Sequence, residues 1–200
     1  DDSIMAEWEN IHNKVIFDIN TEKASISTND IRYFYNEMGK NQQFDLSGKI
    51  DGTLNDFTAK NLVLKDNKNS QIVGDVNFRN LFQKEGKGEF YMKGSFDKVS
   101  SSYDDLITLL PNVLGEKLPS SLSKLGQFNL RGDAEITTKA INTDFELATR
   151  LGNVKSNMVM TNIDNIDNAK YVGNVQLNNF DLGTFLNRKD FGITTLNIDV

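Results

Sequence analysis

The chain has 200 residues, of which 38% are hydrophobic and 25% are charged, as is typical of a folded, water-soluble protein. Its 22 basic and 28 acidic residues give a net charge of -6 without a basic cluster, which argues against nucleic-acid binding because phosphate neutralisation needs clustered cations. The absence of cysteine excludes a disulfide framework and a thiolate metal site, and no apolar run approaches the roughly 20 residues that span a bilayer.

The first strand signals follow a weakly patterned N-terminal stretch. Apolar and polar residues alternate over residues 15–19 and again, in the opposite phase, over residues 24–26. The change of phase at Glu22 and Lys23 predicts a turn, so we expect a first hairpin there. Apolar residues at helical spacing then predict a short helix over residues 28–39.

The clearest strand is FDLSGKIDGTL, residues 44–54, whose even positions are apolar or glycine and whose odd positions are mostly polar. Successive side chains of a strand point to opposite sides, so this strand has one dry face and one wet face. Glycine on the dry face is unusual, because Val or Leu would contribute more to a core. The same arrangement recurs four times, in Ile72–Phe78, Phe90–Phe96, Phe128–Ile136 and Tyr171–Leu177.

A helical pattern interrupts the strands between Phe90–Phe96 and Phe128–Ile136. Leucines recur at helical spacing behind a cap at Ser101 or Ser102, and Pro111 and Pro119 divide the pattern. We therefore predict a broken, leucine-rich helical insert over residues 101–125.

One later hairpin can be predicted in register. Apolar residues occupy odd positions over residues 145–151 and even positions over residues 154–160. A two-residue turn at Gly152 and Asn153 would pair residue 151 with 154 and residue 145 with 160, all on one face.

Together these signals predict a mainly β fold over residues 1–200, an elongated and strongly curved antiparallel sheet that forms an open, taco-shaped groove or a partly closed barrel. About a dozen strands at about 4.8 Å spacing would make a trough roughly 60 Å long. The sequence begins at Asp1 and ends within the strand pattern of Leu196, Ile198 and Val200. We therefore expect it to be a segment of a longer protein.

Residues that could carry chemistry are few. His12 is the single histidine and has no neighbours with which to build a triad or a metal site. Residues 86–88, Gly-Lys-Gly, lack the ending of a phosphate-binding loop, and residues 164–168 miss the spacing of a calcium loop. We therefore expect no enzyme activity, no cofactor and no metal.

The chain resembles one family in four stretches: FDLSGKIDGTLNDFTAKNLVL, QIVGDVNF, LLPNVLGEKLPSSLSKLGQFNLRGDAEI and YVGNVQLNNFDLGTFL. These are similar to the repetitive β-rich region of the AsmA-like proteins, specifically the TamB (translocation and assembly module) branch of the Bacteroidetes type. The resemblance covers most of the chain from about Ile31 onward. It implies a periplasmic segment of an inner-membrane-anchored protein, which carries phospholipid toward the outer membrane or assists outer-membrane protein assembly and secretion.

A lipid conduit is the first functional hypothesis, in which apolar side chains of the dry face line a groove that shields acyl chains. The candidate groove residues are Phe44, Leu46, Ile50, Ile72, Val76, Phe90, Met92, Phe96, Phe128, Leu130, Phe145 and Met158. The helical insert must also bury its apolar side chains, so we expect it to lie across the dry face as a lid or plug. The candidate lid residues are Leu106, Ile107, Leu110 and Leu114.

Other interpretations stay open. A dry face ordinarily packs on another sheet or helix, which would leave no groove. The open edges of the sheet would suit a scaffold or chaperone that adds strands of outer-membrane proteins by β-augmentation. A purely structural β-solenoid or surface adhesin would instead have a closed interior filled with protein.

Overall fold

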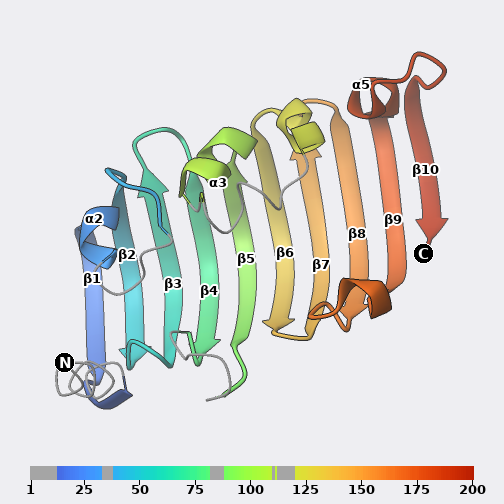
Figure 1. Cartoon of the computed structure of the whole chain (residues 1–200). Helices are drawn as coiled ribbons and strands as arrows, with labels where there is room; N and C mark the ends of the chain where they lie inside the picture. Colours follow the sequence, from blue (N-terminus) through green and yellow to red (C-terminus); the bar gives the residue numbers. More distant parts are fainter. Residues whose placement is uncertain (1–12, 33–37, 82–87, 110, 112–119) are drawn as a thin grey trace.

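Ten antiparallel strands follow one another in chain order and form one sheet in the computed structural model (Figure 1), which describes residues 13–32, 38–81, 88–109, 111 and 120–200. β1 and β10 lie at opposite edges and do not pair with each other, so the sheet is not closed into a barrel. The prediction of a mainly β, antiparallel fold with few helices is confirmed, with ten described strands instead of about twelve.

The strands are β1 (Phe17–Ser27), β2 (Gln43–Gly52), β3 (Phe57–Asp66), β4 (Gln71–Arg79), β5 (Tyr91–Ser101), β6 (Phe128–Thr137), β7 (Ala140–Thr149), β8 (Gly152–Thr161), β9 (Lys170–Asp181) and β10 (Ile193–Asp199). The described helices are short: α2 (Thr28–Ile31), α3 (Tyr103–Leu109), the 3-10 helices η1 (Ser120–Leu125) and η2 (Ile166–Asn168), and α5 (Leu182–Leu186). Figure 1 shows α2, α3 and α5 at the same end of the sheet.

β1 is one strand where the sequence predicts a hairpin. Both halves of β1 pair with β2, from Phe17 opposite Gly52 to Ser27 opposite Gln43. Two residues of β1, Glu22 and Lys23, lie opposite one residue of β2, so they form a β-bulge and the predicted turn is wrong. One extra residue reverses the alternation of side chains, and this reversal has the same appearance in a sequence as a turn.

Three other strands contain a bulge of the same kind. β3 has its extra residue near Asn61, β5 near Asp97 and β9 near Asn179, as the shifts in the registers of their neighbours show. Asn61 and Asn179 have φ angles of 51° and 47°, a backbone region that asparagine tolerates better than most residues. The bulges restore each strand's apolar residues to the same face of the sheet.

Glycines lie beside these bulges on the neighbouring strands. Gly74 of β4 has φ 153°, and a Cβ atom added there would lie 2.1 Å from the carbonyl oxygen of Ser95. Gly132 of β6 has φ 137°, and an added Cβ would lie 2.1 Å from the carbonyl oxygen of Asp144. The backbone at both positions therefore requires glycine, which explains why glycine recurs within apolar strands.

The turn between β7 and β8 lies two residues earlier than predicted. Thr149 pairs with Gly152 and Phe145 pairs with Ser156, so Arg150 and Leu151 make the turn. Leu151 is buried against Leu125, and this contact places it in the turn and not in the strand. The shift of two residues preserves the predicted face of every side chain in the hairpin.

Three segments at one end of the sheet are linked into a row that we call the helical rim: α3, η1 and α5. The amide of Gly39, before β2, donates to the carbonyl of Leu109 in α3 at 2.7 Å. The amine of Lys124 in η1 donates to two carbonyls of α5, those of Thr184 and Phe185, each at 3.0 Å. Leu125 of η1 packs in a buried cluster with Leu151 and Phe180, which joins the rim to the sheet.

Short helices lie within both segments that the sequence predicts to be helical, α2 in residues 28–39 and α3 and η1 in residues 101–125, whereas Met38 and Gly39 are not helical and Ser101 belongs to β5. Ser27 caps α2, one residue before the predicted start, and residues 33–37 of the predicted helix over 28–39 lie outside the described residues. In the insert over 101–125, Ser102 caps α3 by accepting from the amide of Asp105 at 3.2 Å. The predicted bend at Pro119 lies outside the described residues.

Replacing Gly132 with alanine should lower the free energy of unfolding by about 1–3 kcal/mol, because the backbone must leave its present conformation. Gly192→Ala is the matched control, since an added Cβ there meets no atom within 4 Å, and it should stay within about 0.5 kcal/mol of the parent. Urea denaturation of the three proteins measures both values. Equal stability of the two variants would contradict the proposed requirement for glycine.

Asp181 caps α5 by accepting from the amide of Thr184 at 2.9 Å, and this hydrogen bond lowers the pKa of the Asp181 carboxyl below its ordinary value. A lowered pKa stabilises the fold above the ordinary carboxyl pKa, and the stabilisation is lost as pH falls through the lowered pKa. Asp181→Ala should therefore reduce Tm at pH 7, and the difference from the parent should shrink at acidic pH. Thermal melts of both proteins at several pH values test this. A difference in Tm that does not change with pH would show that the charge of Asp181 does not contribute to capping.

Candidate functional site

The predicted groove residues share one face of the sheet, which we call the apolar face. The registers place Phe44 opposite Ile26 and Leu46 opposite Leu64, and the same correspondence continues from strand to strand as far as β10. Phe90 precedes β5, and its ring lies 6.4 Å from that of Phe78, which is on the same face. The twelve candidate residues therefore belong to one continuous surface.

Further apolar residues extend this face beyond the predicted set. They are Phe17, Ile19, Ala24, Ile26, Phe57, Ala59, Leu62, Leu64, Phe78, Val99, Ile136, Ile141, Leu147, Val154, Met160, Tyr171, Val175, Leu177, Leu196 and Ile198. Alternation within each strand is the sequence signal that could find them. In β3 the bulge hides this signal, because Phe57 and Leu64 share a face although their spacing is odd.

The apolar face is only partly shielded from solvent. Of the candidate groove residues, Phe44, Leu46 and Val76 are buried and the other nine are half-buried. Exposure is greater toward both edges of the sheet, where Ile19 of β1 is 41% exposed, Tyr171 of β9 is 48% exposed and Ile198 of β10 is 42% exposed. A face covered by a second sheet would have most of its large side chains fully buried. Within the described part of the chain, these side chains mainly shield one another.

The two ends of the apolar face differ in what lies beside them. At one end the helical rim contacts the face, since Leu147, Val154 and Leu177 pack against the cluster formed by Leu125, Leu151 and Phe180. At the other end three aromatic rings follow one another across β3, β4 and the start of β5. The centroids of Phe57 and Phe78 are 5.1 Å apart, and those of Phe78 and Phe90 are 6.4 Å apart.

The described parts of the helical insert, α3 and η1, lie at the ends of the strands, and the prediction that the insert crosses the apolar face as a lid or plug stays a prediction because residues 110 and 112–119 lie outside the described residues. α3 and η1 lie where β5 ends and β6 begins, at the same end of the sheet as α5 (Figure 1). Leu106 and Ile107 are half-buried in α3, whereas Leu110 and Leu114 lie outside the described residues. Hydrogen bonds to the neighbouring connections hold the described parts of the insert at the ends of the strands.

The opposite, polar face carries exposed ions and amides. Arg131 of β6 and Lys155 of β8 both bind Glu146 of β7, and the Nε atom of Arg131 lies 2.8 Å from its carboxylate. The hydrogen bond from Arg131, followed by that from Lys155, lowers the pKa of Glu146. Exposed ion pairs add little to stability, so the polar face contributes mainly to solubility and to any binding on that side.

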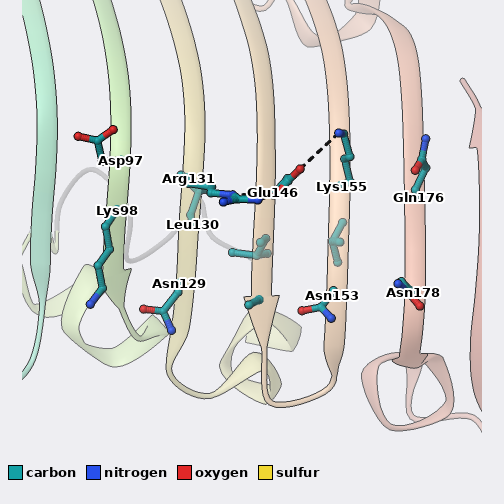
Figure 2. Close-up of a pocket in the computed structure, with 13 residues that line it drawn as sticks. Asp97, Lys98, Asn129, Leu130, Arg131, Glu146, Asn153, Lys155, Gln176 and Asn178 are labelled. Atoms are coloured by element: carbon teal, nitrogen blue, oxygen red, sulfur yellow. Dashed lines mark hydrogen bonds and ion pairs between the residues drawn. The ribbon is translucent and has the colours of Figure 1, made fainter.

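A hollow of about 590 Å³ lies on this polar face, across β5 to β9 (Figure 2). Two rows of side chains border it. The sequence predicts these residues only as the solvent-facing side of their strands. One row contains Arg131, Glu146 and Lys155, and the other contains Asn129, Asn153 and Asn178. No sequence motif marks this hollow, because its residues come from five strands.

The structure also describes some of the segments that were considered as metal or phosphate sites. Residues 164–168 form a loop with η2, as predicted, whereas His12 and most of residues 86–88 lie outside the described residues. In the described ranges no group of three or more His, Asp or Glu side chains could hold a metal ion. The helices of those ranges are all too short or too polar to cross a membrane.

Comparisons with protein families, with curated proteins and with solved structures find no match to this chain.

The apolar face should contribute to stability even though it is only half-buried. Phe145 lies on this face, and Asn142 lies on the polar face of the same strand. Phe145→Ala should lower the free energy of unfolding by about 1–3 kcal/mol through lost apolar burial. Asn142→Ala should change it by less than about 0.5 kcal/mol. Chemical denaturation measures both, and a neutral Phe145→Ala would show that the face is not packed as described.

Proposed function

We propose that the chain is a non-enzymatic segment of a lipid conduit, in which the apolar face shields the acyl chains of phospholipids. The observation that carries this proposal is the continuity of a partly exposed apolar face across all ten described strands. Soluble monomers rarely expose contiguous apolar patches of more than a few hundred Å², and larger ones mark sites for membranes, ligands or partners. Asp66, which lies opposite Phe44 at the end of β3, is a charged residue at the margin of this face.

Acyl chains suit such a face energetically. Each methylene removed from water contributes about 0.8 kcal/mol, so the burial of a few methylenes provides affinity without a headgroup anchor. Half-buried Met92, Met158 and Met160 add adaptable side chains, because methionine is unbranched and polarisable. A surface of this kind binds lipids by chain length and not by headgroup, which is what a conduit needs.

The proposal includes curvature of the sheet into a groove. Bulges and glycine kinks are the devices that curve β-sheets, and here they alternate across the middle of the first six strands. The bulges of β1, β3 and β5 lie beside Gly48 of β2, Gly74 of β4 and Gly132 of β6. This line of bulges and glycines supports a groove that is deepest over β1 to β6.

The resemblance to the TamB branch of the AsmA-like proteins belongs to the same proposal. It implies a location in the periplasm, as part of an inner-membrane-anchored protein that acts in outer-membrane biogenesis. Ten strands at about 4.8 Å spacing extend for about 43 Å, which is close to the roughly 40 Å thickness of one bilayer. A bridge between two membranes would therefore need several such segments in series.

Photocrosslinking from the two faces of one strand tests the proposal. A photoreactive phenylalanine analogue replaces Phe145 on the apolar face or Asp144 on the polar face, and the protein is illuminated with phospholipid vesicles. We expect phospholipid adducts from position 145, at least about tenfold more than from position 144, because only the first faces the acyl chains. Mass spectrometry identifies the adducts.

Three outcomes separate this function from the others. Equal lipid labelling from both positions would show non-specific contact and overturn the conduit. Crosslinks from position 145 to polypeptide in place of lipid, in a periplasmic extract, would favour a scaffold for outer-membrane proteins. Crosslinks from position 145 only within the chain itself would favour a closed structural β-solenoid.

A further inference from the structure

The hollow on the polar face is a second feature that could hold a ligand, and it is independent of the apolar face. Its polar lining residues and Ala148 project from the side of the sheet opposite to Phe145 and Met158, because residues of odd and even position alternate between faces. Leu130, Leu147 and Val154 also line it, although they belong to the apolar face. Its volume of about 590 Å³ lies within the 300–1,000 Å³ range typical of small-molecule sites.

A small side chain makes the floor of the hollow. Ala148 of β7 lies opposite Asn129 of β6 on one side and Asn153 of β8 on the other, and Asn153 lies opposite Asn178 of β9. Ala148 has the shortest side chain of this row, so a depression forms between its neighbours. Figure 2 shows Asn129, Asn153 and Asn178 at the same level across the strands.

The three amides have unused hydrogen-bonding capacity. Within the described residues, the side chains of Asn129, Asn153 and Asn178 make no hydrogen bond to protein, although each amide offers two donors and one acceptor oxygen. Groups that both donate and accept match hydroxyl groups, which do the same. Asn153 and Asn178 lie on adjacent strands, about 4.8 Å apart, whereas β7 separates Asn129 from Asn153 by two strand spacings, about 9.6 Å. The three amides therefore suit a ligand with several hydroxyls distributed along its length.

The charges around the hollow favour an anion over a cation. Three cations line it, Lys98, Arg131 and Lys155, against two carboxylates, those of Asp97 and Glu146, in a chain whose net charge is -6. Glu146 is shared by Arg131 and Lys155. Lys98 has no ion-pair partner in the described ranges, and Figure 2 shows it extending from β5 toward the level of Asn129.

From these contacts we propose that the hollow over Ala148 binds a hydroxyl-rich ligand carrying one acidic group, such as a uronic acid or a sugar phosphate. The amides of Asn129, Asn153 and Asn178 bind the hydroxyls. Lys98 binds the carboxylate or phosphate. Because the hollow and the apolar face are on opposite sides of the sheet, this binding does not depend on lipid.

A titration of the ¹⁵N-labelled chain, followed by NMR, tests the proposal with four probes: glucuronate, glucose 6-phosphate, methyl glucoside and acetate. We expect the two acidic sugars to shift the amide signals of Ala148, Asn153 and Asn178. Methyl glucoside should bind at least about fivefold more weakly because it lacks the charge, and acetate because it lacks the hydroxyls. Whichever of glucuronate and glucose 6-phosphate binds more tightly shows whether the hollow prefers a carboxylate or a phosphate.

Variants on one strand then locate the site. Ala148→Phe fills the hollow and should weaken binding at least about tenfold, whereas Asn142→Phe, exposed on the same face about 20 Å away, should leave it unchanged. Lys98→Ala should abolish the preference for acidic sugars without changing the backbone spectrum. If Ala148→Phe disturbs the fold, Asn153→Ala removes one amide without added bulk and should weaken binding severalfold.

Two results would overturn the proposal. The first is the absence of shifts at the hollow with either acidic sugar, or equal shifts with acetate, which would indicate only an ionic contact. The second is binding that survives both Ala148→Phe and Asn153→Ala, which would place the ligand elsewhere.

Discussion

The phase of the side chains is the constraint on which the rest of this structure depends. In a sheet, one extra residue sends every following side chain of that strand to the opposite face. The strands β1, β3, β5 and β9 each contain such a residue, and the apolar residues on both sides of it still reach one face. The sequence must therefore change its own alternation at each bulge, as between Ile19 and Ala24.

The glycines follow from the same constraint. An added Cβ atom at these glycines would collide with the backbone of a paired strand, which carries a bulge in the case of Gly48 and carries none in the case of Gly132. Gly48 illustrates this, since an added Cβ would lie 2.9 Å from the carbonyl oxygen of Asn61 at the bulge of β3. The apolar face stays continuous at these positions because glycine does not interrupt it with a polar group.

The sequence predicted the content of the apolar face better than its connections. All twelve candidate groove residues lie on one face, because alternation within a strand is a local property that a sequence displays directly. The connections between strands were harder to predict, because a bulge such as that at Glu22 reverses the alternation of apolar and polar residues in the same way as a turn does. Leu151 adopts a turn because it packs on Leu125 and Phe180, residues distant in sequence, and no local pattern reveals that contact. The hollow over Ala148 was missed for the same reason, because five strands contribute to it.

The position of the helical insert has a similar explanation. Its leucines predict burial but do not specify which part of an apolar surface they reach. Hydrogen bonds between Gly39 and Leu109, and between Lys124 and the carbonyls of α5, hold the described parts at one end of the strands. The helical rim therefore contacts the apolar face at one end of the sheet.

Whether the apolar face is open and takes up lipid can be measured directly, because the chain contains no cysteine. Single-cysteine variants at Phe96, Phe145 and Met158 on the apolar face, and at Asp144 and Asn157 on the polar face, are reacted with a maleimide with and without phospholipid. We expect all five to react without lipid, and only the three on the apolar face to be protected when lipid is present. Apolar-face cysteines that never react, or that react equally with and without lipid, would contradict an open, lipid-shielding face.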